Sequence, residues 1–448
     1  MTLAFHDAIS AALYGDSCPG PAIVGGGKLP SAYGVTELAV ASIGAAGQAL
    51  ARAIGHGDVV VDRRLASLWF DMTLQPQGWD MPSVWDSVAG NYRAADRWIR
   101  LHTNAPHHRQ AALKVLECTE DRAAVADAVA RWQAEELETA IVAAGGCAAT
   151  QYTTDEWLAR PTGMAVAAEP LIHWGQADTI SPVPLPDASA NRPLSGVKIL
   201  DLTRVLAGPV ASRFLAGFGA TVLRIDPAHW DEPGVIPEVN PGKFSAGLDL
   251  QVQEDRKVFE GLLAEADVLL HGYRLGALDG LGYDPGARRY LNPGLVDVSL
   301  NAYGHTGPWS TRRGFDSLVQ MSAGIAAHGQ ARAGADHPVP LPVQALDHAT
   351  GYLMAAAVLS ALAAAARGET VPAAHLSLAR TAELLAGMQR LADGPEIRKP
   401  ADSDYAPGTE NSAWGPGRRL AAALHLDTSP LHWNLPANRC NSAPACWR

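Results

Sequence analysis

The sequence lacks the features that mark several large classes of protein. Its five cysteines are scattered and form no C-x-x-C pair, so neither a disulfide framework nor a cysteine-based zinc site is indicated. It has no basic block and a formal net charge of −11, which argues against nucleic acid or a membrane as a partner. The first residues lack the basic start of a signal peptide, and the most apolar helical run, residues 352–366, is shorter than the roughly 20 residues that span a bilayer. These absences predict a cytoplasmic protein.

The chain also lacks a glycine-rich dinucleotide-binding turn. Asp226 ends an apolar run, where a dinucleotide-binding enzyme would hold a ribose, but the preceding strand-to-helix turn reads LTRVLAGPVAS, without G-x-G-x-x-G. We therefore expect no nicotinamide cofactor. No metal is expected either, because the adjacent His107 and His108 in HTNAPHHR do not face one ion from a regular element.

Short apolar runs alternate with helical patterns in the second half of the chain. Residues 253–265 are amphipathic with the period of a helix, and residues 197–202 have the length of a buried strand. The alternation predicts an α/β fold, with a Rossmann-like parallel sheet covered by helices on both faces. Ligands of such sheets bind beyond the carboxyl ends of the strands. The other expected strands are residues 221–226, 267–273, 295–304, 338–346 and 374–380.

Composition divides the chain into five parts. Residues 181–196 are rich in Pro, Ser, Asn and Asp and form the expected linker. The large Rossmann-like domain is expected at residues 197–390, and a smaller α/β domain at residues 95–180, where helical patterns alternate with strand candidates. Residues 391–448, rich in Pro and polar residues, predict an irregular tail. Residues 1–94 combine helical and strand patterns.

Part of residues 1–94 repeats a later segment. Residues 36–67 and 346–382 each contain an acidic residue, an alanine-rich helical pattern, a turn with Gly and a strand pattern, and their match places Glu37 opposite Asp347. The first part is then a decayed second copy of the large domain. A chance likeness between two alanine-rich helices is the competing interpretation.

Several motifs, in order, resemble family III coenzyme A transferases, the carnitine CoA-transferase and bile-acid-inducible protein F group. They are PLSGVKILDLTRVLAGP, GATVLRID, NPGKFSAGLDL, HGYRLGALDGLGYD and AYGHTGPWSTRRGFDSLVQMSAG. Residues 95–180 are similar to the family's small domain, which normally follows the large one. The resemblance implies an enzyme that moves coenzyme A from an acyl-CoA to a small carboxylic acid. It also implies a homodimer, which in this family is usually interlocked.

The family's catalytic aspartate falls on Asp347. Moving CoA between carboxylic acids requires a carboxylate that attacks a thioester and passes through anhydride and enzyme-thioester intermediates. By position alone a helix cap is the favoured role for Asp347, since Asp is a common N-cap residue. The ordered motifs favour the nucleophile. Asp316, in RRGFDSLVQ, matches an acidic residue of the family's active site, and a helix cap is the alternative for it.

The resemblance also implies contacts with coenzyme A. Arginine and lysine are the expected partners of its phosphates. The candidate contacts are Val205, Leu206 and Ala207 beside the thioester and pantetheine, Tyr273 stacked on adenine, and Arg224, Lys243 and Arg274 at the phosphates.

Two other functions stay open. A 2-methylacyl-CoA racemase needs an acid and a base on opposite faces of the α-carbon. Phe315 stands where that branch of the superfamily carries a histidine, and His348 starts a helix in a direction unsuited to this role. A non-catalytic CoA-binding protein would suit the rearranged domain order and the departures from the family pattern at Pro227, Phe244 and Gly272.

Overall fold

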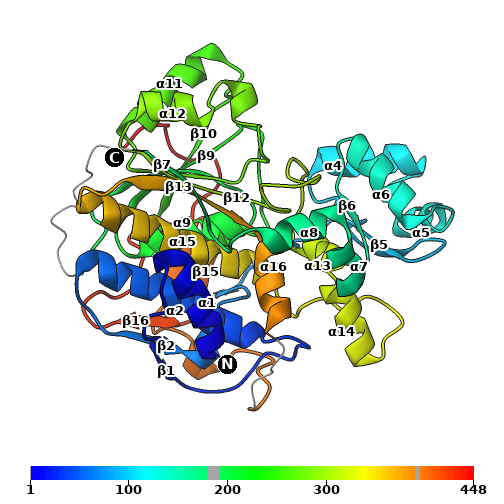
Figure 1. Cartoon of the computed structure of the whole chain (residues 1–448), viewed down its shortest axis with the longest axis horizontal. Coiled ribbons are helices and arrows are strands. Elements are labelled where there is room, and N and C mark those ends of the chain that lie inside the picture. Colours follow the sequence, from blue (N-terminus) through cyan, green and yellow to red (C-terminus); the bar gives the residue numbers. More distant parts are fainter. Residues whose placement is uncertain (1, 179–190, 389–393) are drawn as a thin grey trace.

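The core of the protein is a seven-stranded sheet with six parallel strands. A computed structural model describes residues 2–178, 191–388 and 394–448. Within these residues the strand order is β10-β9-β8-β11-β12-β13-β7, and only β7 is antiparallel to its neighbour (Figure 1). This architecture confirms the predicted Rossmann-like α/β fold. The strands are β7 (His173–Asp178), β8 (Lys198–Leu202), β9 (Thr221–Asp226), β10 (Lys243–Gly247), β11 (Val268–His271), β12 (Val296–Asn301) and β13 (Val371–Ser377).

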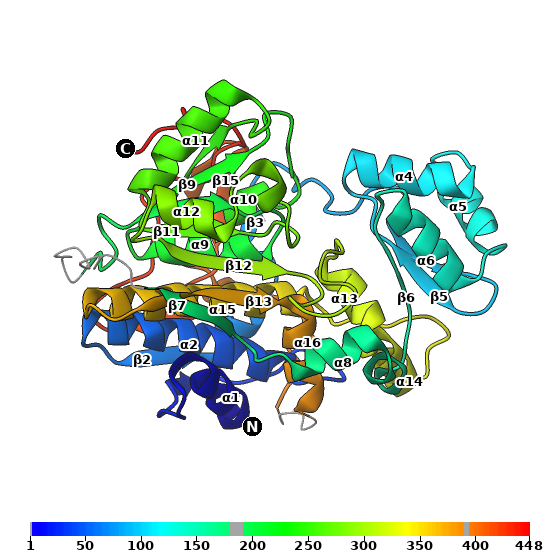
Figure 2. The ribbon, with the colours of Figure 1, turned by 45° about the horizontal axis from the view of Figure 1, so that its top comes forward.

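Helices cover both faces of this sheet (Figure 2). On one face α9 (Ala207–Gly217) and α15 (Ala345–Ala366) pack against strand residues such as Ile199 and Val268. On the other face α11 (Gln253–Glu265) and α12 (Pro285–Leu291) cover the alternate residues, such as Leu200 and Leu269. Because the strands contribute side chains to two cores, apolar residues such as Ile199 and Leu200 follow one another without alternating with polar ones.

The central helix α15 is longer than the sequence suggested. It has 22 residues and a hydropathy of 1.7, long and apolar enough by these measures to cross a membrane. However, 83% of its apolar window is buried inside the protein, where the helix lies between the large sheet and α2 (Val35–Ile54) (Figure 2). The expected 15-residue run was too short because the helix starts at Ala345 and includes polar residues in its first turns.

Residues from both ends of the chain build two small sheets beside this core. One joins β1 (Ala22–Val24) and β2 (Val59–Asp62) to β16 (Leu424–Leu426). The other joins β3 (Leu74–Pro76) to β14 (Glu410–Ser412) and β15 (Gly415–Arg419). The expectation of an irregular tail is therefore wrong for these segments, because β16 buries its apolar side chains where it pairs with β2. The adjoining helices are α1 (Thr2–Tyr14), α2 and α3 (Arg63–Leu68).

A separate antiparallel sheet stands to the right in Figure 1. It begins at Gly90 rather than at residue 95, and α7 (Thr154–Ala159) and α8 (Pro161–Ala168) lead from it back to β7 of the large sheet. The end of the expected small domain therefore belongs to the large sheet. Residues 181–190 of the expected linker lie outside the described residues. The small unit contains β4 (Gly90–Arg93), β5 (Trp98–Leu101), β6 (Ala148–Thr150), α4 (Pro106–Leu116), α5 (Arg122–Val129) and α6 (Ala134–Ala143).

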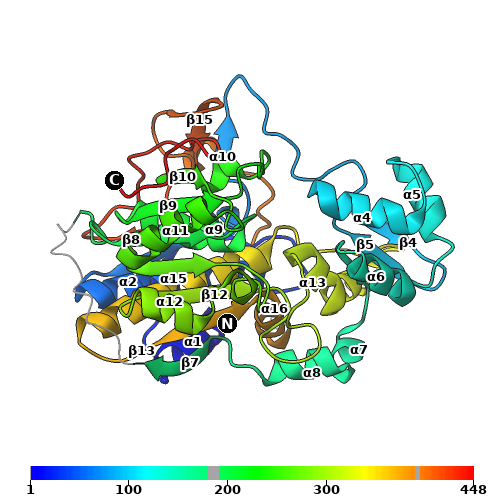
Figure 3. The same cartoon turned by 90° about the horizontal axis from the view of Figure 1, so that it is seen from above.

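Helix α13 (Asp316–Ser322) packs between the small unit and the helices of the large domain. It lies between them when the molecule is seen from above (Figure 3), and its Leu318 packs with Cys147 and Ala149 near β6. The strand expected at residues 338–346 is wrong. Pro338, Pro340 and Pro342 have no N–H for a sheet ladder, and these residues run irregularly into α15. The remaining helices are α10 (Ile236–Val239), α14 (Ile325–Ala333) and α16 (Leu378–Gly387).

Candidate active site

Asp347 lies at the wall of a cavity between the large sheet and the small unit. It is the third residue of α15, and its residue surface is only 8% exposed. The cavity has a volume of about 430 Å³, within the range of roughly 300–1,000 Å³ typical of small-molecule sites. Leu202, Asn301 and Ala302, at or beyond the carboxyl ends of β8 and β12, also line it. The cavity therefore lies where the sheet topology predicts a ligand site.

Asp316 holds the first turn of α15 in place. Its Oδ2 atom accepts hydrogen bonds from the backbone N–H groups of Leu346, at 2.8 Å, and Asp347, at 3.0 Å. Gln320 donates a hydrogen bond to the other carboxylate oxygen of Asp316. Asp316 is fully buried, so its own side chain supports the helix start rather than lining the cavity. Asp316 therefore does not cap its own helix α13 but accepts hydrogen bonds from the first turn of α15, next to the predicted nucleophile.

The two carboxyl groups influence each other's protonation. Burial raises the pKa of Asp347 well above its ordinary value, and the nearby Asp316 carboxylate raises it further. Burial also raises the pKa of Asp316, although its hydrogen bonds with Gln320 and the backbone oppose this effect. Strongly perturbed groups of this kind are enriched at functional sites, although structural networks perturb pKa values too. Here the perturbed Asp347 also lines a cavity.

The loop before α9 carries backbone strain at the cavity wall. Val205 has φ = 63°, in the left-handed region that a β-branched residue rarely adopts. Its N–H donates to both carboxylate oxygens of Glu232, at 3.0 and 3.2 Å, and Arg224 donates to the same carboxylate at 2.8 Å. Strain of this kind persists only where surrounding contacts enforce it. Glu232 therefore fixes the conformation of the loop at residues 205–207.

α15 approaches the same loop very closely. Gly351 lies one helical turn after Asp347, on the same side of α15. A Cβ atom at Gly351 would lie 2.3 Å from the carbonyl oxygen of Ala207, so only glycine fits there. The close packing of α15 and α9 sets the distance between the carboxylate and the loop.

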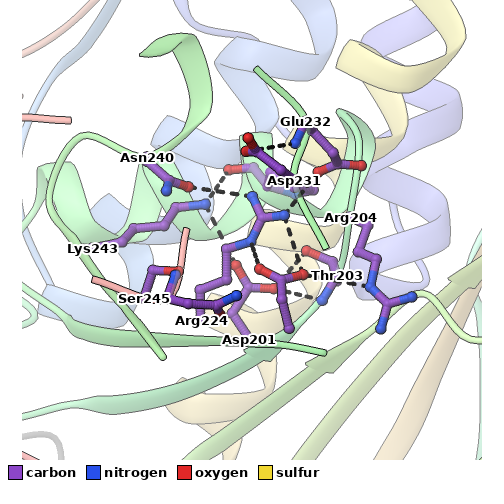
Figure 4. Close-up of polar contacts among 12 residues, drawn as sticks. Asp201, Thr203, Arg204, Arg224, Asp231, Glu232, Asn240, Lys243 and Ser245 are labelled. Atoms are coloured by element: carbon purple, nitrogen blue, oxygen red, sulfur yellow. Dashed lines mark hydrogen bonds and ion pairs between the residues drawn. The ribbon is translucent and has the colours of Figure 1, made fainter. Parts of the chain in front are cut away.

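Arg224 and Lys243 do not occupy the phosphate-binding positions predicted for them. Arg224 is fully buried and ion-paired with Asp226 at 2.6 Å as well as with Glu232 (Figure 4). Lys243 is 1% exposed and its Nζ donates to the carbonyl of Pro209 at 2.9 Å. Neither residue lines the cavity, so both predictions are corrected. Carboxylates match the buried charges: Asp226 of the same strand and Glu232 of the loop after it for Arg224, and Asp201 of β8 for Lys243.

The other predicted coenzyme A contacts do line the cavity. They are Val205, Leu206, Ala207, Tyr273 and Arg274. The ring of Tyr273 is partly occupied, because the Arg204 guanidinium lies 5.5 Å from its centre. Arg204 also lies 4.7 Å from the ring of Trp230. Stacking of adenine on Tyr273 would therefore use the rest of the ring or require Arg204 to move.

Sequence analysis missed the residues that the small unit adds to the cavity. His107 and His108, at the start of α4, line it together with Asp347. Phe315 also lines it and stacks on His102 of the small unit, with ring centres 3.7 Å apart. Two adjacent histidines argue against a metal site, and their sequence alone does not indicate a ligand site. No local pattern shows that α4 meets a residue more than 200 positions later.

His348 has no access to this cavity. It is 2% exposed and stacks on Phe70, with ring centres 5.3 Å apart. Burial lowers its pKa to about 3. It is not among the residues that line the cavity, which agrees with the expectation that it points elsewhere.

The fold and the cavity define an α/β protein with an acidic group buried at the ligand-binding edge of a parallel sheet. Residues 194–413, just under half of the chain, match the family model described as CoA-transferase family III. The predicted resemblance to this family is confirmed over these residues.

The chain spans about half or less of the length of the curated relatives it matches. It is 31% identical over 253 residues to an acyl-CoA transferase of Gibberella moniliformis, covering 52% of this chain and 44% of that protein. It is 34% identical over 194 residues to the succinyl-CoA:glutarate CoA-transferase of Mus musculus, covering 40% and 44%. It is 34% identical over 150 residues to the acetyl-CoA:oxalate CoA-transferase of Acetobacter aceti, covering 31% and 39%.

Solved structures show a similar partial match. The crystal structure of the hypothetical protein Rv3272 from Mycobacterium tuberculosis is 30% identical, with a TM-score of 0.39, covering 44% of this chain and 56% of that one. A CAIB/BAIF family protein from Brucella suis is 27% identical, with a TM-score of 0.38, covering 50% and 65%.

Proposed function

We propose that the protein is an acyl-CoA:carboxylate CoA-transferase that uses Asp347 as its nucleophile. The position of Asp347 carries this proposal, because it places an almost buried carboxylate on the wall of a cavity beside the strained loop at residues 205–207. The family III match and the transferase activities in the names of the relatives support the reaction class.

The reaction would proceed through four exchanges at one carboxyl group. An Asp347 oxygen attacks the thioester carbonyl, forming a mixed anhydride and releasing the CoA thiolate. The thiolate attacks the Asp347 carboxyl carbon, giving an aspartyl-CoA thioester and the free donor acid. The acceptor carboxylate attacks this thioester to form a second anhydride and releases the thiolate again. The thiolate then attacks the acceptor carbonyl, which yields the new acyl-CoA and restores Asp347.

The surroundings of Asp347 suit these steps. The N-terminus of α15 carries a partial positive charge, which favours an anionic side chain in the first turn. Apolar side chains such as Leu206 and Leu378 line the cavity and would limit hydrolysis of the anhydrides by water. Burial and the nearby Asp316 carboxylate raise the pKa of Asp347, and attack uses its ionised form. The fixed loop at residues 205–207 would hold the thioester beside the carboxylate.

The assembly and location of the protein stay predictions. The small unit of the same chain completes the cavity wall with His107 and His108. One chain therefore supplies groups from both of its halves to one site, and the cavity wall in itself does not require a partner chain. The homodimer and the cytoplasmic location still need direct measurement.

Trapping of the acylated aspartate tests the proposed function. The protein is incubated with a panel of acyl-CoA donors, treated with hydroxylamine and digested, and the peptide containing Asp347 is examined for a hydroxamate by mass spectrometry. We expect the hydroxamate in the native protein and not in Asp347→Ala. Full exchange activity in Asp347→Ala would disprove the role of this residue.

The same preparations separate the two other functions. CoA binding without exchange of labelled CoA between acids would favour a non-catalytic CoA-binding protein. Deuterium incorporation from solvent at the α-carbon of a 2-methylacyl-CoA would favour a racemase.

A further inference from the structure

The cavity is lined by more cationic than anionic groups. Its lining residues include four arginines, two histidines and Asp347 as the one acidic residue. Two of the arginines are already paired: Arg204 lies 3.4 Å from Asp226, and Arg312 is ion-paired with Glu138 and donates to the carbonyl of Ala148 at 2.7 Å. The guanidinium groups of Arg204 and Arg312 are therefore engaged by other residues of the protein.

The other two arginines are free to meet a ligand. Within the described residues, the side chains of Arg274 and Arg313 form neither a hydrogen bond nor an ion pair, and both residues are exposed. Arg274 follows β11 of the large sheet, whereas Arg313 lies close enough to His107 and His108 of the small unit to lower the pKa of both. The two arginines therefore belong to different parts of the cavity wall.

His108 is a buried polar group without a partner. It is 4% exposed, and both of its ring nitrogens are buried with no hydrogen bond among the described residues. Burial, with His107 and Arg313 nearby, lowers its pKa to about 3, so the ring is neutral near pH 7 and carries one N–H donor. Buried polar groups in proteins are nearly always hydrogen-bonded, so an unpaired one at a cavity wall calls for a ligand atom.

We propose that Arg313 and His108 bind the second carboxylate of a dicarboxylic acid whose first carboxyl group reacts at Asp347. This proposal rests on the proposed function and adds the substrate class to it. The guanidinium of Arg313 would form an ion pair with the second carboxylate, and the ring N–H of His108 would donate a hydrogen bond to it. Phe315, 5.9 Å from the ring of His108, would pack against the short carbon chain of the acid.

A monocarboxylic acid of equal length would leave both groups without a partner. Leaving a buried hydrogen-bonding group unsatisfied, together with the loss of a charged partner, weakens binding by roughly 10-fold to 100-fold. The cavity should therefore discriminate between two five-carbon acids, glutarate and valerate, which differ at the far end of the chain.

Calorimetric titration of the CoA-saturated protein tests this proposal without relying on turnover. We expect glutarate to bind at least about 10-fold more tightly than valerate to the native protein. Arg313→Gln and His108→Phe should each reduce this preference to less than about threefold, and His108→Gln, which retains an N–H donor, should restore much of it. Arg332→Gln is the matched control, since it removes an exposed arginine of α14 that does not line the cavity and should keep the preference.

The outcomes separate this inference from the proposed function. Equal binding of the two acids by the native protein, or an unchanged preference in both Arg313→Gln and folded His108 variants, would overturn the dicarboxylate site. A glutarate preference that depends on Arg313, without a hydroxamate at Asp347 for any donor, would leave the site intact and refute the transferase mechanism. Thermal unfolding identifies any variant that fails to fold. If the His108 variants do not fold, the acid preference of Arg313→Gln alone tests the dicarboxylate site.

Discussion

Helices α2 and α15 place an acidic residue at the same helix position in two different roles. They lie side by side, each has an acidic residue at its third position, and each is followed by a strand that runs directly into a short helix (Figure 2). Glu37 of α2 forms a buried ion pair with Arg63 of α3. Asp347 of α15 has no ion pair among the described residues and has the carboxylate of Asp316 as its neighbour. The partner of the acid, rather than its place on the helix, separates a structural group from a candidate nucleophile.

The largest difference should appear in catalysis. Replacing a nucleophile that forms a covalent intermediate removes the reaction path, so Asp347→Asn should reduce CoA exchange by at least about a thousand-fold. Glu37→Gln should retain exchange within about threefold, because Glu37 does not line the cavity. Exchange of labelled CoA between acids, measured well below the unfolding temperature, compares the two. Similar losses in both variants would contradict the distinction.

The next effect concerns the carboxylate beside Asp347. Asp316→Asn removes a like charge that raises the pKa of Asp347, so this pKa should fall. Since attack requires the ionised form, the acid limb of the pH–rate profile should move to lower pH. The altered support of the helix start should also reduce the maximal rate by roughly 10- to 100-fold. An acid limb at unchanged pH would mean that Asp347 does not control it.

The ion pair of α2 should matter for stability. Removing one partner of a buried pair leaves the other charge uncompensated, and Glu37→Ala should lower the free energy of unfolding by about 3 kcal/mol. The double variant with Arg63→Met should recover part of this loss. Denaturant unfolding of the single and double variants measures both effects. A loss below about 0.5 kcal/mol would place Glu37 among weak surface pairs.

The smallest effect is an increase in stability. Because the pKa of Asp347 is higher in the folded protein than in the unfolded chain, its contribution to stability is full below about pH 4 and is lost as the pH rises through the folded pKa. Asp347→Asn keeps the shape without the charge. We expect it to stabilise the protein by about 1 kcal/mol near pH 7, with little gain near pH 4. Thermal unfolding at both values tests this, and an equal gain at both would exclude the electrostatic cause.

Sequence periodicity predicted what depends on local chemistry. The apolar runs of β8, β9, β11 and β12 gave the parallel sheet, and the ordered motifs gave Asp347 together with the loop at residues 205–207. The strand expected at residues 338–346 failed because prolines interrupt an otherwise apolar run. The decayed-copy interpretation of residues 1–94 stays a prediction, although α2 and α15 share their order of elements.

The parts that sequence analysis missed depend on which side chains pair in the folded protein. The charges of Arg224 and Lys243 suggested phosphate contacts, but buried carboxylates neutralise them. His108 and Arg313 are more than 200 residues apart, and only folding brings both to one cavity. The residue type predicts which ligands a side chain could bind, whereas its neighbours in the folded protein determine whether it is available to bind them.

The pairing of β2 with β16 has a consequence for biosynthesis. Val61 pairs with Leu424, about 360 residues later. At a translation rate of 5–20 residues per second, β2 would wait roughly 20 to 70 seconds on the ribosome-bound chain before its partner strand is made. During that interval the edge of β2 that will pair with β16 stays exposed to other nascent chains. Shielding of this edge by a chaperone should therefore raise the yield of protein in which β2 and β16 have paired.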